Sequence, residues 1–156
     1  MGTTLSNVEE IFSANPKNNS GRHFGARIVF DNDGFLYLSF GDRGEMMTSQ
    51  DLTKHNGTVI RLNDDGTVPS DNPFFNTDNA QPEIWSYGHR NIQCMSIHPE
   101  TGKIWTHEHG PRGGDEINVL KKGANYGWPL ASFGIDYDGD IITQDTFAEG
   151  TERPTY

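Results

Sequence analysis

A repeated pattern of β-rich runs and tight turns constrains the fold of this chain more than any other feature of its sequence. Residues 27–31 and 35–40 are rich in aromatic and β-branched side chains, and the turn Asp31-Asn-Asp-Gly34 lies between them. An Asp-Gly pair between two such runs is a strong signal for a β-hairpin. Runs 93–98 and 103–108 repeat this hairpin about 67 residues later, and self-similarity at a fixed period is typical of repeat folds.

Further β-rich runs complete two similar units. Residues 58–62 and 83–87 follow the first hairpin, and residues 116–120 follow the second. Units of about four antiparallel strands are what the blades of a β-propeller contribute, although any meander of hairpins would produce some accidental similarity. We therefore predict an all-β fold: a partial β-propeller of about two blades, each a four-stranded antiparallel sheet.

The two units set the domain boundaries that we expect. One covers approximately residues 24–87 and the next residues 88–130, within a single propeller domain that includes all of residues 1–156. Two blades leave sheet edges exposed and cannot close a ring, so we expect the remaining blades outside this chain. The composition agrees, because a hydrophobic fraction of 33% with 18 glycines and 8 prolines suits short strands and turns.

Charge and composition exclude several kinds of partner. The formal net charge is −10 and Lys and Arg do not cluster, whereas a nucleic-acid-binding protein carries a basic patch. No apolar run is long enough to span a membrane. The single Cys94 cannot form an intramolecular disulfide. The first residues lack the regions of a signal peptide, so the protein is either cytoplasmic or has its natural N-terminus outside this sequence, and we expect the second.

The densest group of chemistry-bearing residues lies in the loop at 105–118. His107, Glu108 and His109 resemble a metal-binding triplet, but in a strand the two histidines share one face and Glu108 points to the other. The histidines could bind zinc, yet the other ligands of a zinc site are not evident. The following Gly110-Pro111 offers backbone carbonyl oxygens, which suit calcium. The alternative is a glycine-rich turn without a metal.

Three other segments carry candidate functional residues. His55, in a polar loop just before a strand, could accept a proton from a substrate hydroxyl, or could be a surface histidine. Gly88-His-Arg-Asn-Ile-Gln93 offers a guanidinium and two amides, which suit an anionic or quinoid ligand, or a turn stabilised by its own side chains. Asp136-Tyr-Asp-Gly-Asp140 has the alternating carboxylates of calcium loops, although a plain Asp-Gly turn explains it equally well.

Taken in order, these segments resemble the soluble quinoprotein glucose/sorbosone dehydrogenases, the aldose sugar dehydrogenases that use pyrroloquinoline quinone. The resemblance extends over nearly the whole chain. Five motifs in the right order carry it, and together they are far more specific than any one alone. They are Gly41-Asp-Arg-Gly44, His55 before Gly57-Thr-Val-Ile-Arg-Leu-Asn-Asp-Asp-Gly-Thr-Val-Pro-Ser-Asp-Asn-Pro73, Gly88-His-Arg-Asn-x-Gln93, Gly110-Pro-x-x-x-Asp-Glu-Ile-Asn118 and Asn125-Tyr-Gly-Trp-Pro129.

The resemblance implies a six-bladed β-propeller with the quinone over its axis, and oxidation of the C1 hydroxyl of an aldose by hydride transfer to the quinone. By similarity, His55 would be the general base and Arg90 would stabilise negative charge on the quinone oxygen. Asn91 and Gln93 would contact the cofactor or the sugar. The implied calcium ligands are the carbonyl groups of Gly110 and Pro111 for an ion that also holds the quinone, and Glu116, Tyr126 and Asp136 for a structural ion.

The resemblance also implies partners and a location. The full-length protein would bind an aldose and pass electrons to an external acceptor, would be periplasmic or secreted, and could form a homodimer. Residues that hold the quinone carboxylates are expected in later blades, so we expect weak or absent activity from this chain alone. The chain departs from the family at Ile92-Gln-Cys94, where Pro-Gln-Gly is usual.

Two alternatives stay open on the sequence alone. A calcium-dependent propeller hydrolase of sugar lactones would use side-chain carboxylates around its metal, and it would have little need of Gly88-His-Arg-Asn91. A non-catalytic propeller fragment that only binds calcium would show no quinone-dependent dye reduction.

Overall fold

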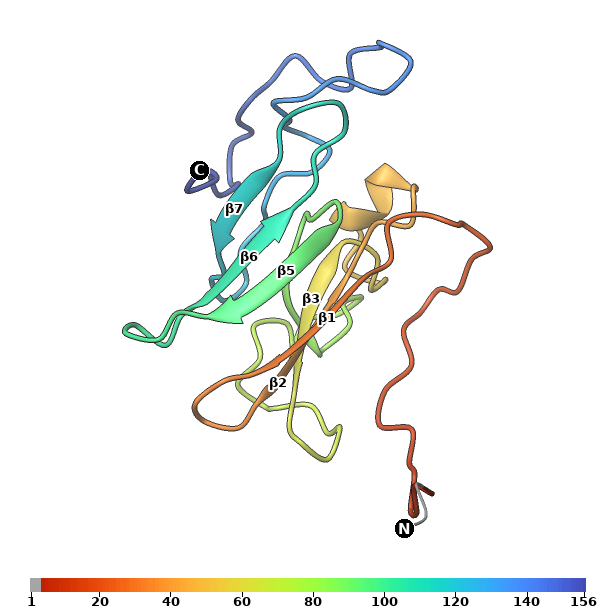
Figure 1. The fold of residues 1–156 in the computed structure, drawn as a ribbon, viewed down its shortest axis with the longest axis vertical. Helices are drawn as coiled ribbons and strands as arrows, with labels where there is room; N and C mark the ends of the chain where they lie inside the picture. Colours follow the sequence, from red (N-terminus) through yellow and green to blue (C-terminus); the bar gives the residue numbers. More distant parts are fainter. Residues whose placement is uncertain (1–3) are drawn as a thin grey trace.

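The computed structural model describes residues 4–156, and within this range seven strands form two antiparallel sheets (Figure 1). The predicted all-β class is confirmed. A single short 3-10 helix, η1 (Met46–Gln50), lies between the second and third strands of the described chain. The four-stranded sheet consists of β1 (Gly25–Phe30), β2 (Leu36–Phe40), β3 (Thr58–Leu62) and β4 (Ile84–Tyr87), and the three-stranded sheet of β5 (Ile92–Ile97), β6 (Ile104–Glu108) and β7 (Glu116–Val119).

Local turn chemistry explains the hairpin between β1 and β2. The Asp31 carboxylate accepts hydrogen bonds from the backbone N–H groups of Asp33 (3.0 Å) and Phe35 (2.9 Å). Gly34 has a φ of 87°, which favours a residue without a side chain. The turn sets the register in which Phe30 faces Leu36. The predicted hairpin is therefore confirmed, together with its reason.

The second sheet has one strand fewer than the blade of four that the sequence predicts. After β7 the chain turns back, and its next segment pairs with the first sheet. Tyr87 and Asn125 form a parallel bridge, and the N–H groups of Tyr126 and Trp128 donate to the carbonyl groups of Tyr87 (2.8 Å) and Gly88 (2.9 Å). These bonds carry Trp128 to the end of the four-stranded sheet. Further along the described chain, only residues 155 and 156 meet the edge of β7, where Thr155 N–H donates to Ile117 O and Ile117 N–H donates to Tyr156 O, both at 2.8 Å.

The core consists of two apolar clusters, one on each face of the four-stranded sheet. Alternate residues of a strand point to opposite faces, so Val59 and Ile60 of β3 belong to different clusters. The cluster between the two sheets contains Tyr37, Val59, Ile92, Met95 and Ile104. The cluster on the other face of the four-stranded sheet contains Leu36, Ile60, Leu62 and Ile84, and Phe12, Leu52 and Phe74 pack against it.

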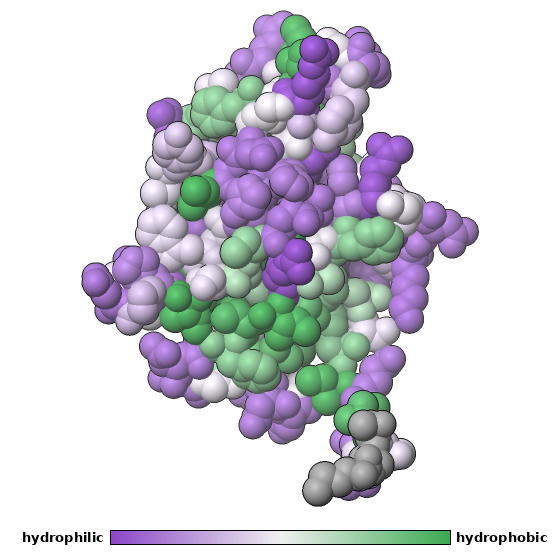
Figure 2. All heavy atoms as spheres, viewed as in Figure 1, coloured by the Kyte–Doolittle hydropathy of each residue, from purple (hydrophilic) through white to green (hydrophobic). Residues whose placement is uncertain are grey.

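β1 and β5 lie side by side where the sheets meet (Figure 1). β1 exposes Ile28 (62%) and Phe30 (53%), and an apolar patch covers this part of the surface in Figure 2. Within residues 4–156 no helix has the length and apolar character needed to cross a membrane.

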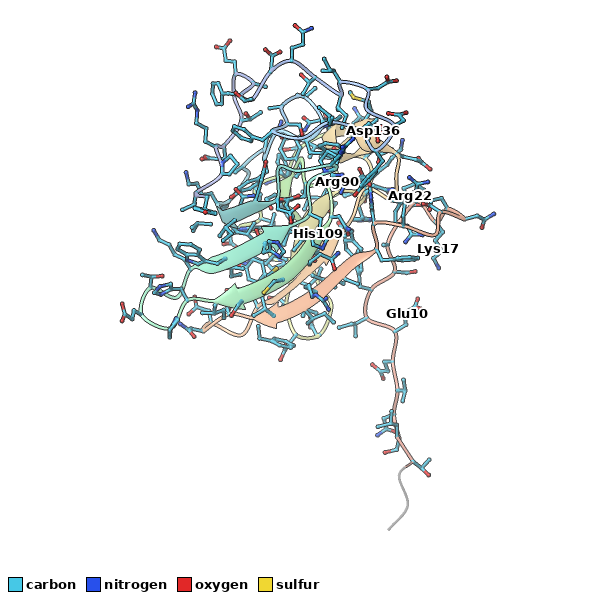
Figure 3. The ribbon with its side chains drawn as sticks, turned by 45° about the horizontal axis from the view of Figure 1, so that its top comes forward. Glu10, Lys17, Arg22, Arg90, His109 and Asp136 are labelled. Atoms are coloured by element: carbon cyan, nitrogen blue, oxygen red, sulfur yellow. The ribbon has the colours of Figure 1, made fainter. Side chains whose placement is uncertain are left out.

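The direction of the strands determines where the polar loops gather. In an antiparallel meander, even-numbered strands run the same way, so the loops after β2, β4 and β6 emerge at one end of the molecule. The segment parallel to β4 reaches the same end. Figure 3 shows Arg22, Arg90 and Asp136 near this end, whereas Lys17 and Glu10 lie on the N-terminal segment that leads away from the sheets.

Candidate functional site

Asp42 connects the loops at this end of the sheets. Its side chain is fully buried, and its Oδ2 accepts a hydrogen bond from Trp128 Nε1 at 2.8 Å. Its backbone N–H donates to the carbonyl oxygen of Arg90 at 2.9 Å. Segments that are far apart in the sequence are therefore joined through one residue.

His23 is held by the same carboxylate. His23 Nδ1 lies 2.5 Å from Asp42 Oδ1, and that oxygen also accepts the Gly44 N–H at 2.7 Å. A carboxylate can only accept, so Nδ1 carries the proton and donates it to Asp42. Nε2 is then the ring nitrogen with a free lone pair, and an oriented imidazole of this kind can take a proton from a substrate.

A cavity of about 290 Å³ lies against His23. Its wall brings together five of the residues that the sequence singles out, and it includes Tyr137. A smaller cavity of about 70 Å³ adjoins it and shares His23, Arg90, Pro111 and Tyr137. The larger cavity is lined by His23, Arg90, Asn91, His109, Gly110, Pro111, Asp115 and Tyr137.

Arg90 is fixed in the wall of this cavity. It is 5% exposed, and its Nη1 donates to the carbonyl oxygens of His109 (3.0 Å) and Gly110 (2.7 Å). Its guanidinium carbon lies 5.3 Å from the centre of the Trp128 ring. Arg90 Nε is buried and has no hydrogen-bond partner within the described residues, so one donor is left for a ligand.

The buried carboxylate of Glu108 holds the backbone of Arg90 in place. Glu108 Oε2 accepts the Arg90 backbone N–H at 2.7 Å, and Oε1 lies 2.9 Å from His89 Nδ1. Burial raises the pKa of Glu108, but the charge and hydrogen bond of His89 outweigh it, so this pKa lies below its ordinary value. Glu108 is buried, whereas His107 and His109 are partly exposed, which confirms the predicted alternation along β6.

Asn91 and Gln93 lie beside the cavity. Gln93 Nε2 donates to Asn91 Oδ1 at 3.0 Å, and the same oxygen accepts the N–H of Gly25 at 3.2 Å. These bonds tie the loop after β4 to the start of β1. Asn91 lines the cavity, whereas Gln93 is not part of its lining and reaches it only through the Asn91 amide.

The predicted calcium ligands fall into separate places. Gly110 and Pro111 line the main cavity, while Glu116 lines a second, very small cavity of about 10 Å³ that also includes Glu108, Gly110 and Pro111. Burial and the neighbouring Glu108 carboxylate raise the pKa of Glu116 to about 7.

Tyr126 and Asp136 do not join Glu116. The Tyr126 hydroxyl donates to Val119 O (2.7 Å) and accepts the Lys121 N–H (2.9 Å), and its ring stacks on His89. Asp136 lines the 70 Å³ cavity instead, because its loop pairs with Arg112 through Ile135. The set of three predicted for one ion is thus not assembled in this structure.

His55 lies away from Arg90. It lines a different cavity of about 430 Å³, with Phe24, Phe40 and Arg43. His55 is 4% exposed, and both ring nitrogens are engaged: Nδ1 accepts the Asn15 N–H at 2.9 Å, and Nε2 lies 2.8 Å from Glu83 Oε1. The structure therefore does not bring His55 together with the other residues assigned to catalysis.

Sequence reasoning missed His23 as a functional residue. It treated the polar stretch before β1 as a loop, and the histidine at its end has no motif of its own. The available signal was Gly41-Asp-Arg-Gly44, a motif of the resemblance in which Asp42 had no assigned role. A buried aspartate needs a partner, but only the fold shows that the partner is His23.

Comparison with protein families gives one match over the whole chain. The family model described as Glucose / Sorbosone dehydrogenase matches residues 1–156. The aldose sugar dehydrogenase YliI of Escherichia coli is 46% identical over 154 residues, which cover 97% of this chain and 42% of that protein. Quinoprotein glucose dehydrogenase B of Acinetobacter calcoaceticus is 36% identical over 126 residues, or 69% of this chain and 26% of that protein.

Solved structures agree with the sequence comparison. The apo form of the soluble aldose sugar dehydrogenase from Escherichia coli is 45% identical with a TM-score of 0.94, covering 97% of this chain and 44% of that one. The pyrroloquinoline-quinone-bound aldose sugar dehydrogenase of Streptomyces coelicolor is 32% identical with a TM-score of 0.69, covering 86% and 35%. The chain thus spans less than half the length of these similar proteins, 42% in the case of YliI.

Proposed function

Because this chain belongs to the glucose/sorbosone dehydrogenase family, we propose that the protein oxidises the C1 hydroxyl of aldoses with pyrroloquinoline quinone as hydride acceptor. The single observation that carries this proposal is the cavity in which an oriented imidazole, His23, faces the fixed guanidinium of Arg90. The names of the quinoprotein and quinone-bound relatives support the choice of cofactor. Electrons would leave to an external acceptor.

We also propose that the two sheets are two blades of a six-bladed propeller, with the other blades outside these residues. Face-to-face stacking of two antiparallel meanders supports this, as does the apolar surface on β1 at Ile28 and Phe30. A periplasmic or secreted location and a homodimer stay predictions. So does weak or absent activity of this chain alone.

In this proposal the general base is His23 and not His55. Asp42 fixes the tautomer of His23, so Nε2 takes the proton from the C1 hydroxyl while the hydride leaves C1. Asp42 also stabilises the imidazolium that results, because a buried carboxylate beside it is negatively charged. His55 lacks this freedom, since Asn15 and Glu83 occupy both of its ring nitrogens.

The residues of the cavity fit a quinone with anionic oxygens. Arg90 has a buried Nε without a partner among the described residues, and Asn91 lines the same cavity. Arg90 and Asn91 would hold the cofactor, Gln93 would keep the Asn91 amide in place through its hydrogen bond, and Arg90 would stabilise negative charge on the quinone oxygens. When bound, the quinone supplies the hydride acceptor.

The donor set beneath this cavity fits calcium. The 10 Å³ cavity has room for about one small ion, and its lining includes Glu108, Glu116, Gly110 and Pro111. Arg90 also lines it and donates to the Gly110 carbonyl oxygen at 2.7 Å, so an ion there would share that oxygen, which has a second lone pair. Carboxylate and carbonyl oxygens are the ligands that calcium prefers. Gly110, Pro111 and Glu116 would therefore hold the ion, which would polarise the cofactor. Tyr126 and Asp136, which the resemblance assigns with Glu116 to a structural ion, lie outside the lining of this cavity.

Reconstitution tests both the reaction and the base. The full-length protein is supplied with Ca²⁺, pyrroloquinoline quinone, glucose and a dye acceptor. Quinone binding is measured separately by quenching of tryptophan fluorescence. We expect His23→Ala to bind the quinone and to lose at least about 10²-fold in kcat. His98→Ala, at the far end of β5, is the matched control.

The outcomes separate the two parts of the proposal. Absence of dye reduction by the full-length wild-type protein would refute the sugar dehydrogenase activity, whereas this chain alone is expected to show weak or absent activity. Loss of turnover in folded His55→Ala, with a normal rate in His23→Ala, would return the base to His55.

A further inference from the structure

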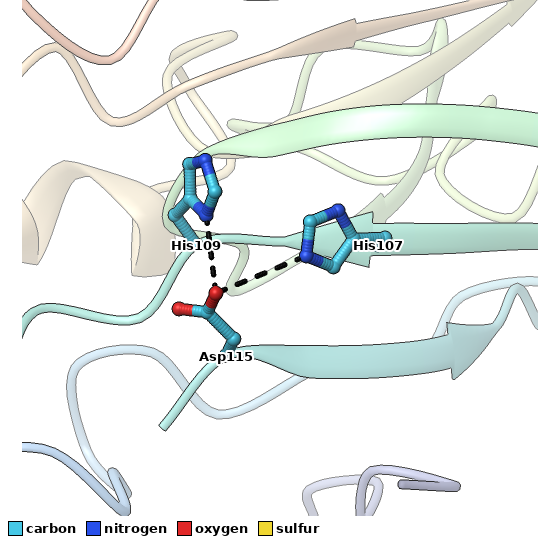
Figure 4. Close-up of side chains that lie close together, drawn as sticks. All are labelled: His107, His109 and Asp115. Carbon is cyan, nitrogen blue, oxygen red and sulfur yellow. Dashed lines mark hydrogen bonds and ion pairs between the residues drawn. The ribbon is translucent and has the colours of Figure 1, made fainter. Parts of the chain in front are cut away.

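A cluster of two histidines and one aspartate lies on the outer face of the three-stranded sheet, at the rim of the main cavity (Figure 4). His107 is in β6, His109 follows the strand, and Asp115 immediately precedes β7. Because Glu108 pairs with Glu116 in the β6–β7 ladder, the residues flanking that pair come together. This His107–His109–Asp115 cluster takes no part in the mechanism above.

The candidate ligand atoms of the cluster lie close together, and the shortest separation equals that of ligands around one zinc ion. His109 Nδ1 lies 3.3 Å from Asp115 Oδ2, His107 Nε2 lies 3.9 Å from it, and all three atoms are within 4.8 Å of one another. Tetrahedral zinc with bonds of about 2.0–2.1 Å separates its ligands by roughly 3.3 Å. Charge-assisted hydrogen bonds are about 2.7–2.9 Å long, so both distances exceed those of strong direct ion pairs.

We propose that His107 Nε2, His109 Nδ1 and Asp115 Oδ2 bind a zinc ion, with water as the fourth ligand. Two imidazoles and one carboxylate suit zinc, whereas calcium prefers oxygen ligands alone. The side chains of the three residues are 40%, 51% and 55% exposed, which leaves an entry path and an open fourth position.

A backbone hydrogen bond orients the Asp115 carboxylate toward the two histidines. Its Oδ1 accepts the backbone N–H of Gly110 at 3.0 Å, which leaves Oδ2 directed at the histidines.

The site is distinct from the proposed calcium seat and goes beyond the proposed function. It uses side chains on the exposed face of β6, whereas the calcium seat uses carbonyl groups and the buried Glu116. His109 and Asp115 also line the 290 Å³ cavity, so a zinc ion would place two positive charges at its rim. Zinc binding requires neither quinone nor sugar.

Metal binding alone tests the proposal. Tag-free protein is freed of transition metals, kept in excess Ca²⁺ to fill oxygen sites, and titrated with Zn²⁺ by calorimetry at pH 7.5. Co²⁺ replaces Zn²⁺ in a second titration, in which visible absorption reports four-coordinate geometry. We expect one equivalent to bind, and His107→Ala and Asp115→Asn each to weaken binding by at least about tenfold.

Controls fix the identity of the ligands. His98→Ala removes another histidine of the same sheet, and Cys94→Ser removes the thiol that lies opposite His107 in the β5–β6 ladder. Neither should change the affinity. Circular dichroism confirms that each variant is folded, and Asp115→Asn preserves the side-chain shape. Unchanged affinity in folded His107→Ala and Asp115→Asn would overturn the proposal, and so would loss of binding in Cys94→Ser alone.

Discussion

Replacement of Asp42 should destabilise the protein more than replacement of almost any other polar residue. Its buried carboxylate accepts from Trp128 Nε1 (2.8 Å), Gly44 N (2.7 Å) and His23 Nδ1 (2.5 Å). In Asp42→Ala the Trp128 indole N–H is buried without an acceptor, which costs about 1–3 kcal/mol, and each of the other lost bonds adds about 1 kcal/mol. We expect the free energy of unfolding to fall by about 3–5 kcal/mol.

Asp42→Asn refines this expectation. The amide has one acceptor oxygen, so its NH₂ must face a donor of either Trp128 or His23, and the cost is about 1–3 kcal/mol. The order of stability should be wild type, then Asp42→Asn, then Asp42→Ala. An amide NH₂ group at position 42 that faces His23 donates to Nδ1, which favours the tautomer with the proton on Nε2. Nε2 then has no lone pair to accept the substrate proton, so Asp42→Asn should lose at least about 10²-fold in kcat.

Urea unfolding, followed by tryptophan fluorescence, measures these differences in the free energy of unfolding. The comparison requires that the variants have equal slopes of this free energy against urea concentration. Asp64→Asn, in an exposed turn, is the matched control and should change stability by less than about 0.5 kcal/mol. A free energy of unfolding for Asp42→Ala within about 0.5 kcal/mol of wild type would refute the view that this carboxylate joins the loops.

Three further perturbations test the core, an ion pair and the calcium seat. Ile92→Ala, at a fully buried position between the sheets, should lower the free energy of unfolding by about 2–5 kcal/mol in the same urea assay. Burial raises the pKa of Glu83, but the hydrogen bond from His55 outweighs it, so the net shift is downward. The ionised Glu83 therefore stabilises the fold above its unfolded pKa of about 4.5, and this contribution is lost as the pH falls through the folded pKa. In Glu83→Gln, the free energy of unfolding measured from pH 7 to pH 3 should lack this part of its dependence on pH. In Gly110→Ala the added carbon would lie 2.2 Å from a backbone oxygen of the same loop, so calorimetric calcium affinity should fall, whereas Gly21→Ala meets no atom within 4 Å and should not change it.

Most of the fold could be predicted from the sequence because its determinants are local. The turn Asp31-Asn-Asp-Gly34 carries both the acceptor and the glycine that its hairpin needs, and the β-rich runs around it alternate between two apolar faces. The missing fourth strand of the second unit could not be predicted in this way. The segment at Asn125 pairs with Tyr87, and no pattern within the segment itself indicates which sheet edge it will meet.

The same distinction between local sequence patterns and contacts between distant segments applies to the candidate site. Arg90, Gly110 and Pro111, which line one cavity, could be singled out because each lies in a motif whose residue types indicate chemistry without knowledge of contacts. The histidines could not be ranked, since a polar loop surrounds both His23 and His55 in the sequence. What distinguishes them is which ring nitrogens are occupied, and that depends on partners from distant segments.

The hydrogen bonds of Asp42 explain why motifs so far apart occur in one chain. Gly41-Asp-Arg-Gly44 supplies the carboxylate, Asn125-Tyr-Gly-Trp-Pro129 supplies the indole donor, and the backbone of the Arg90 loop accepts the Asp42 N–H. Each of these segments lies in a loop outside the strands, and the bonds of Asp42 fix their positions relative to one another. His23 receives its orientation from the same carboxylate. The motifs therefore act as one hydrogen-bonded unit, and Asp42 is the residue through which a change in any of them would reach the base.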